Sequence, residues 1–231
     1  MNWKMIYLAK RNPKLAPEDF PQAWREHSAL GAGCTNVRAK VLSVAQCSRV
    51  LQGPSLPGAS DNYDGVNLLL LRDLQSAIDI WNDAETLAIM RPDEPRVFST
   101  YVREFTLVCE ESVIREAPRS GVVLVGFLRR SASLSREQWQ AGFAHAQAQQ
   151  TLVQGPFSQA VRVVANRVHL EPPPGYEYDS IVEWWFDSED AARLAFSQSS
   201  DVRQSLSEAL SSLCDLAGSV FMFTRVTHKR P

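Results

Sequence analysis

The chain has 231 residues, of which 45% are hydrophobic and 22% charged, and its net charge is −2 at pH 7. This composition is typical of a globular protein, and the charge gives no electrostatic footprint for nucleic acid or an anionic membrane. The apolar runs are strand-sized, far short of the roughly 20 residues that a membrane span needs. Residues 1–7 lack a signal-peptide core. We therefore expect a cytoplasmic protein with no nucleic-acid or membrane partner.

One segment occurs twice in the chain. Residues 63–71 form a Tyr-Asp turn that leads into an apolar run, and residues 178–186 repeat the pattern 115 residues later, from position 63 to position 178. Upstream, residues 15–20 match residues 134–139 at an offset of 119. Matched segments in the same order indicate an old duplication. We therefore predict two units, residues 1–112 and residues 120–231, each large enough for a modest core.

Each unit is predicted to contain four strands and two helices. In the first unit the strands are 4–10, 35–51 (interrupted near Gln46), 66–71 and 98–108, and the helices are 17–33 and 74–90. In the second the strands are 122–129, 159–169, 181–186 and 220–226, and the helices are 134–150 and 188–217, the latter broken near 199–201. A polar linker, 110–120, joins the units.

The order in each unit is β-α-β-β-α-β, which is the ferredoxin-like arrangement of a four-stranded antiparallel sheet with two helices on one face. The predicted fold class is α+β. The free sheet faces need cover, so we expect the two ferredoxin-like units to pack sheet to sheet as an internal pseudo-dimer.

The opening of the chain resembles a known family. Residues 7–20, followed by Trp24, Arg25, Glu26 and His27, resemble the start of EthD-type domains, and both Tyr-Asp turns with the elements after them resemble the same family. These domains belong to the dimeric α/β barrel superfamily, so the resemblance implies an intramolecular barrel with a pocket between the sheet and the helices of each unit. The superfamily includes cofactor-free monooxygenases, isomerases, cyclases, haem enzymes and proteins with no assigned activity, and its fold does not specify a reaction.

The strongest catalytic candidate is His27, onto which the family's helix-end histidine maps. A pKa near 6.5 suits a histidine to general acid-base work. The residues alone favour equally a histidine that caps the C-terminal end of its helix. In the second half His145 aligns with Glu26 and Ala146 with His27, and one helical position is a rotation of about 100°. The second site is therefore either lost or built from His145 at another angle.

The Tyr-Asp turn offers further candidates. Tyr63 and Asp64 precede a strand, where a polar group can reach a pocket beside the helix and work with His27 on a phenolic or carbonyl substrate. The recurrence of the turn as Tyr178-Asp179 favours a structural role, because aspartate bonds nearby backbone amides in turns. We interpret Asp179 as structural and leave the role of Asp64 open.

Aromatic residues are candidates for substrate binding: Tyr7, Trp24, Tyr63 and Trp185. Such side chains are more often part of a core, but an aromatic-lined apolar pocket also suits an aromatic ligand.

Glu183 is a further substrate-binding candidate, because it is a carboxylate within an apolar strand. Buried and unpaired it would be costly, so we expect a raised pKa or a partner. The candidate partners are the strand arginines Arg103, Arg162 and Arg225.

Metal and cofactor patterns are missing from the sequence. The four histidines, His27, His145, His169 and His228, have no ligand spacing, and neither GxGxxG nor Walker patterns occur. Four scattered cysteines are expected to be free thiols. We predict neither a metal nor a cofactor.

The functional hypothesis is a cofactor-independent enzyme that acts on a small hydrophobic, aromatic molecule in a catabolic pathway. Its reaction would be of the lyase, decarboxylase, isomerase or cyclase type, with His27 as acid and base; a cofactor-free oxygenase is a variant. The alternative is a non-catalytic protein that binds such a ligand for a neighbouring enzyme. A further homodimer is left open.

Overall fold

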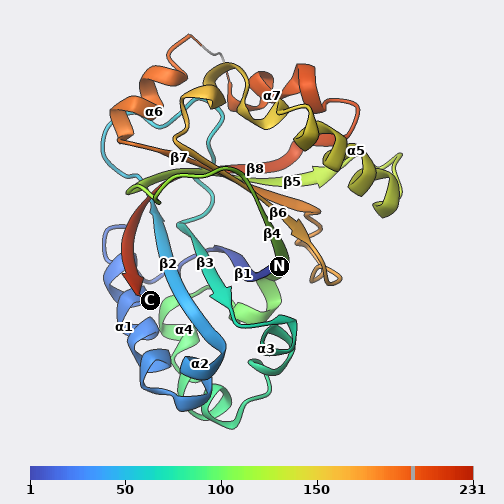
Figure 1. The fold of residues 1–231 in the computed structure, drawn as a ribbon. Helices are drawn as coiled ribbons and strands as arrows, with labels where there is room; N and C mark the ends of the chain where they lie inside the picture. The colour runs from blue at the N-terminus through green and yellow to red at the C-terminus, as the bar shows by residue number, and fades with distance from the viewer. Residues whose placement is uncertain (199–200, 231) are drawn as a thin grey trace.

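The chain forms a closed barrel of eight antiparallel strands flanked by helices on two opposite sides (Figure 1). The computed structural model describes residues 1–198 and 201–230. The strand order around the barrel is β1-β3-β2-β8-β5-β7-β6-β4. The strands are β1 Asn2–Ala9, β2 Val41–Arg49, β3 Gly65–Leu71, β4 Thr106–Arg115, β5 Val122–Arg130, β6 Arg162–Val168, β7 Ser180–Phe186 and β8 Cys214–Arg230. The prediction of an α+β fold with antiparallel strands is confirmed.

The helices divide between the two ends of Figure 1 according to the half of the chain from which they come. The first half supplies α1 Phe20–Gly33, α2 Thr35–Lys40, α3 Leu74–Asp79, a π-helical turn Thr86–Met90 and α4 Glu94–Val97. The second half supplies α5 Arg136–Ala148, α6 Glu189–Ala195 and α7 Val202–Leu210. Short 3-10 turns cover Val102–Phe105, Thr151–Val153 and Gly155–Gln159.

The two halves of the chain contribute matching sets of strands. The first half occupies the order β4-β1-β3-β2 and the second half the order β8-β5-β7-β6. The sets meet at the hydrogen-bonded pairs β2·β8 and β4·β6. The two sheets are therefore joined edge to edge, and their inner faces enclose one core.

Three predicted elements of the first half differ from the structure. Residues 35–40 form α2 instead of a strand, with Val37 as the buried residue. The predicted helix 74–90 is interrupted: Asp73 caps α3 by accepting from the Ser76 amide at 2.7 Å, and α3 ends at Asp79. β4 begins at Thr106 and continues to Arg115, within the predicted linker, because its second half pairs with β6.

The second half follows the prediction more closely. Strands β5, β6 and β7 and helix α5 lie within a few residues of the predicted ranges. The expected helical break at 199–201 falls partly on residues 199 and 200, which lie outside the described residues. β8 is longer than predicted, because it runs along both β5 and β2.

The two Tyr-Asp turns make the same contacts. Asp64 accepts from the Arg11 amide at 2.9 Å and pairs with the Arg11 guanidinium at 3.3 Å. Asp179 accepts from the Arg130 amide at 3.0 Å and pairs with its guanidinium at 2.5 Å. Each aspartate thus fixes the end of a first strand, as β1 in one half and β5 in the other.

The barrel interior is mainly apolar and contains a buried ion cluster. Lys4 Nζ lies 2.6 Å from Glu183 Oε1 and 2.5 Å from Glu111 Oε2. Glu183 also accepts from Asn166 Nδ2 at 2.9 Å and from Trp185 Nε1 at 3.0 Å. The expectation of an arginine partner was wrong: the partner is a lysine from the other half. Burial alone would raise the pKa of Glu183, but Lys4 and Arg119 hold it below its ordinary value.

Among the described residues, no helix combines the length and the apolar character that crossing a membrane requires.

Candidate active site

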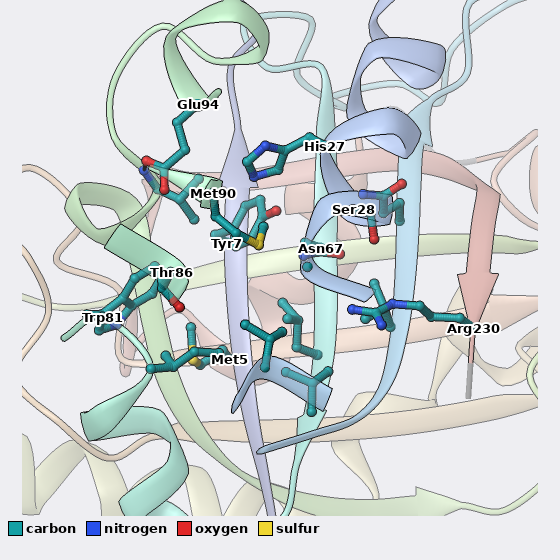
Figure 2. A pocket seen from close by; sticks show the side chains of 18 residues that line it. Met5, Tyr7, His27, Ser28, Asn67, Trp81, Thr86, Met90, Glu94 and Arg230 are labelled. Carbon is teal, nitrogen blue, oxygen red and sulfur yellow. Dashed lines mark hydrogen bonds between the residues drawn. The ribbon is translucent and has the colours of Figure 1, made fainter. Parts of the chain in front are cut away.

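A cavity of about 70 Å³ lies between the outer face of β1, β3 and β2 and the helices of the first half (Figure 2). Its apolar wall consists mainly of Met5, Val37, Val41, Val44, Leu69, Ile80, Trp81, Met90 and Val102. Its polar lining is Tyr7, His27, Ser28, Gln46, Asn67, Thr86, Glu94 and Arg230. A mostly apolar pocket with a few convergent polar groups is typical of a small-molecule site.

Three polar groups of the cavity floor lie in a row across three strands, and the row continues outside the cavity lining to His228 on a fourth strand. Tyr7 on β1 pairs with Asn67 on β3, Asn67 with Gln46 on β2, and Gln46 with His228 on β8. Side chains of directly paired residues point to the same sheet face. We call Tyr7, Asn67, Gln46 and His228 the polar row. The next row on the same face is apolar and ends in a cation: Met5, Leu69, Val44 and Arg230.

His27 reaches the cavity from the middle of α1. It is 4% exposed, and its Nδ1 lies 2.9 Å from Asp93 Oδ2. Asp93 also accepts from Arg96 Nε at 2.7 Å, and the Arg96 and His27 hydrogen bonds hold the pKa of Asp93 below its ordinary value despite its partial burial. An ionised Asp93 fixes the tautomer with the proton on Nδ1, which leaves Nε2 with a free lone pair.

His27 is unprotonated at neutral pH, as a general base must be. Burial lowers its pKa from 6.5, while the hydrogen bond to Asp93 acts in the opposite direction. The imidazole is therefore neutral at pH 7 and becomes stabilised by Asp93 only when it takes up a proton. An aspartate that orients a histidine in this way is the arrangement found in catalytic triads. His27 does not act as a helix cap, since it sits well before the end of α1.

Tyr7 presents a hydroxyl beside His27. Both rings pack edge-on against Phe98, with centroids 5.5 Å and 6.1 Å away. The Tyr7 oxygen accepts from Trp24 Nε1 at 3.1 Å and is hydrogen-bonded by Asn67. Burial raises the pKa of Tyr7, so it stays protonated. With its oxygen occupied as an acceptor, the phenol has its own proton to donate into the cavity.

Glu94 lines the opposite wall from Arg230 in the view of Figure 2. It is 2% exposed, and its Oε2 accepts from the Val102 amide at 2.8 Å. Burial raises the pKa of this carboxyl group. Arg91 is its nearest cation, at 3.6 Å.

Three cavity-lining oxygens have no hydrogen-bond partner within the described chain: Gln46 Oε1, Asn67 Oδ1 and Thr86 Oγ1. The Gln46 amide nitrogen donates to the Trp24 carbonyl at 3.1 Å, which leaves its oxygen free. Buried polar atoms in proteins are nearly always satisfied by protein, water or ligand. These oxygens are therefore the acceptors that the cavity offers to a bound water or ligand.

The structure brings together two of the eight predicted site residues, His27 and Tyr7. Trp24 is fully buried behind the cavity, where it positions Tyr7 and stacks on Phe20 at 5.0 Å. A side chain at Gly65 would collide with Trp24, since an added Cβ would lie 2.7 Å from its ring. Trp24 is thus a support for the cavity wall.

The other predicted residues lie elsewhere. Asp64 is engaged by Arg11 and Arg49 in the turn. Tyr63 packs against the barrel-interior cluster, and Glu183 and Trp185 belong to that interior. His145 is exposed on α5. None of them lines the cavity.

Five polar residues of the site were not among the predicted candidates: Asp93, Glu94, Gln46, Asn67 and Arg230. Asp93 and Glu94 lie just after the predicted helix 74–90, in Arg-Pro-Asp-Glu-Pro, a pattern typical of a helix end. Asn67 had a visible signal, because it is the single polar residue of the apolar strand β3. Asn67 also corresponds to Val182 in the second copy of the repeat.

No group of three or more His, Cys, Asp or Glu side chains able to hold a metal occurs within residues 1–198 and 201–230. All four cysteines are buried free thiols, and burial raises the pKa of each, to about 12 for Cys214.

No protein-family model matches the chain, and no curated protein matches its sequence. Solved structures do match its fold. An anthrone oxidase-like protein has a TM-score of 0.65 at 12% identity, over 99% of this chain and 92% of that one. Provisionally named monooxygenases from Fusobacterium nucleatum and Lactobacillus acidophilus have TM-scores of 0.56 and 0.52, each at 7% identity. Those matches cover 99% of this chain and 93% and 94% of the other chains. The chain therefore has the dimeric α/β barrel fold.

Proposed function

We propose that the chain is a cofactor-independent enzyme that removes a proton from a small aromatic compound, with His27 as the base. The observation that carries the proposal is the buried Asp93–His27 pair at 2.9 Å on the wall of a mostly apolar cavity. A neutral buried imidazole oriented by a carboxylate has the chemistry of a general base.

The proposed step is a single proton transfer. His27 Nε2 takes a proton from an acidic C–H or O–H of the substrate, and Asp93 stabilises the imidazolium that forms. The electron pair moves onto the carbonyl or phenolic oxygen of the substrate. Tyr7 donates its hydroxyl proton in a hydrogen bond to that oxygen, which lowers the energy of the developing negative charge.

The fate of the carbanion defines the reaction class. Return of the proton to another atom gives an isomerase. Departure of a leaving group from the adjacent carbon with its bonding electron pair, while the carbanion pair forms the new double bond, gives a lyase. Reaction with dioxygen as oxidant gives an oxygenase, the variant that is supported by the names of the anthrone oxidase-like and monooxygenase neighbours.

The experiment is deuterium exchange. Aryl ketones and hydroxyaryl carbonyl compounds are incubated with the protein in D₂O, and incorporation at the acidic carbon is followed by NMR under nitrogen and under air. We expect catalysed exchange that His27→Ala reduces by about 10²- to 10⁴-fold. His145→Ala is the matched control, since this exposed histidine occupies nearly the aligned position in the second half, and it should leave exchange unchanged.

The alternative function, ligand binding without catalysis, has a distinct outcome. Compounds would then raise the melting temperature of the protein but show no exchange above buffer. Equal exchange by wild type and His27→Ala would also overturn the proposed role of His27.

We further propose that the barrel arose by tandem duplication of a ferredoxin-like unit of the EthD type. The shared strand order of the two halves and the matching Arg11–Asp64 and Arg130–Asp179 contacts support this.

A further inference from the structure

The cavity of the first half is completed by a residue from the second half. β8 continues past its pairing with β5 and runs along β2, where Arg230 pairs with Val44. Val44 faces the cavity, and the Arg230 side chain lines it from the same sheet face. Figure 2 shows this side chain entering the pocket opposite Glu94. Among the residues that the structure describes, Arg230 is the one arginine in the cavity lining, and a strand from the other half delivers it.

Arg230 has no acidic partner among the described residues. Its Nε is buried without a hydrogen bond, and no ion pair includes it. Arg225, on the same strand, shows the usual alternative: it donates to Gln52 Oε1 at 3.0 Å and pairs with Glu189 at 3.7 Å. A guanidinium that is partly removed from water normally gains a carboxylate or carbonyl partner. The Nε–H group of Arg230 is therefore a buried donor without an acceptor among the described residues.

A second guanidinium lies in the neighbourhood of Arg230. Burial lowers the pKa of His228, and the charges of Arg25 and Arg230 lower it further, so both guanidinium groups lie near this imidazole. The two carboxylates of the site are engaged elsewhere: Glu94 by the Val102 amide, and Asp93 by His27 and Arg96. The Arg230 side of the cavity is thus an anion-attracting surface in a protein whose net charge is −2.

We propose that the ligand is a small aromatic carboxylate whose carboxylate binds Arg230 and whose hydroxyl or N–H donates to the free oxygens of Gln46 and Asn67. A carboxylate matches the two-pronged guanidinium, and a donor on the same molecule satisfies oxygens that otherwise have no partner. The proposal rests on the proposed function only in placing the substrate in this cavity. The carboxylate would bind at the Arg230 wall and the reacting atom would face His27.

The test compares a matched pair of probes, 4-hydroxybenzoate and 4-hydroxybenzamide, which differ in charge but hardly in shape. Isothermal titration with the wild-type chain should give a lower Kd for the carboxylate. Arg230→Gln should weaken carboxylate binding by about 10- to 100-fold and leave amide binding nearly unchanged. Arg230→Lys should retain part of the preference, and Arg225→Gln, the control on the same strand, should retain all of it.

Three outcomes would overturn the proposal: no carboxylate preference in the wild type, an equal preference in Arg230→Gln, or loss of preference in Arg225→Gln. Failure here is separate from failure of the proposed function. If neutral aryl ketones exchange deuterium as fast as their carboxylated analogues, the enzyme proposal stands and the carboxylate proposal falls. If His27→Ala binds 4-hydroxybenzoate as the wild type does, but the wild type catalyses deuterium exchange in no compound, the carboxylate proposal stands and the enzyme proposal falls.

Discussion

The two halves of the barrel share one strand order but use the space between sheet and helices differently. In the first half the row across the sheet is Tyr7, Asn67 and Gln46. The corresponding row in the second half is Gly126, Val182 and Ala165. Above these rows, His27 on α1 corresponds to Ala146 on α5. Each of these four polar residues of the first half therefore has a small or apolar counterpart in the second half.

The second half fills the corresponding space with aromatic rings. Trp184 occupies the position of Leu69 and packs on Phe157 with centroids 4.5 Å apart. A Cβ added at Gly126 would lie 2.9 Å from Phe221 and 3.0 Å from Trp184, so the place of the Tyr7 side chain is taken by these two rings. The comparison teaches that the polar cavity beside His27 is a feature of one half, whereas the pocket of the second half lies along α5, against Trp139, Phe143 and Ala165. The unpaired oxygens of the first-half cavity reduce stability, and the packed half has none of them in the equivalent row.

The largest effect is expected from opening the packed half. Trp184→Leu places the first-half residue in the second half and should lower the free energy of unfolding by about 3 kcal/mol, because neighbouring rings cannot collapse into the space. Urea denaturation measures the change. Leu69→Ala, in the cavity that already exists, should cost about 1–2 kcal/mol less. Equal costs at both positions would contradict the view that the space around Trp184 is packed more tightly than the space around Leu69.

A smaller effect of opposite sign is expected from closing the polar row. Asn67→Val introduces the second-half residue, removes a buried unpaired oxygen and should raise the free energy of unfolding by about 1 kcal/mol. Ligand binding should weaken at the same time. The mirror variant, Val182→Asn, should destabilise by about 1–3 kcal/mol. Loss of stability in Asn67→Val would show that the amide is part of the core and not of a binding site.

The smallest effect is the pH dependence that the buried His27 confers. Burial lowers the pKa of His27 below 6.5, so below pH 6.5 the unfolded chain binds a proton that the folded chain does not. Its contribution to stability is complete above pH 6.5 and is lost as the pH falls through the folded pKa. Unfolding free energies at pH 7.5, 6.5 and 5.5 should fall more steeply for the wild type than for His27→Gln, by less than about 1 kcal/mol. The exchange rate should fall over the same acidic range. Parallel curves for both proteins would refute the assignment.

Much of the fold could be predicted because local sequence patterns indicate its strands and helices. The repeated Tyr-Asp turn and apolar run located β3 and β7, and their partners followed from length and polarity. α2 was missed because Val37 alone faces the core, so six residues gave no periodicity. The long β4 was missed because its polar end is held by β6, which no local pattern shows.

The site was predictable only where a family resemblance or the residue type itself is informative. His27 was found because the family resemblance maps a helix-end histidine onto it, and Tyr7 because an aromatic side chain suits a pocket for an aromatic ligand. Asp93 depends on a contact across 66 residues, and its surroundings resemble a simple helix end. Glu183 attracted attention as a carboxylate in an apolar strand, and the correct inference was its need for a partner. That partner, Lys4, could not be chosen over the strand arginines without the barrel closure.

The contact between β8 and β2 has a consequence for how the protein acquires its binding ability. Thr227 Oγ1 donates to the Gln46 carbonyl at 3.3 Å across 181 residues of chain. Such distant strand pairings are slow to form, because the entropy of a long loop is lost before the contacts compensate for it. Arg230 enters the cavity only when β8 pairs with β2, so the pocket is completed in the same kinetic step as the barrel. During refolding, recovery of carboxylate binding should therefore follow barrel closure, and should not precede it with the earlier, local folding of the first-half helices.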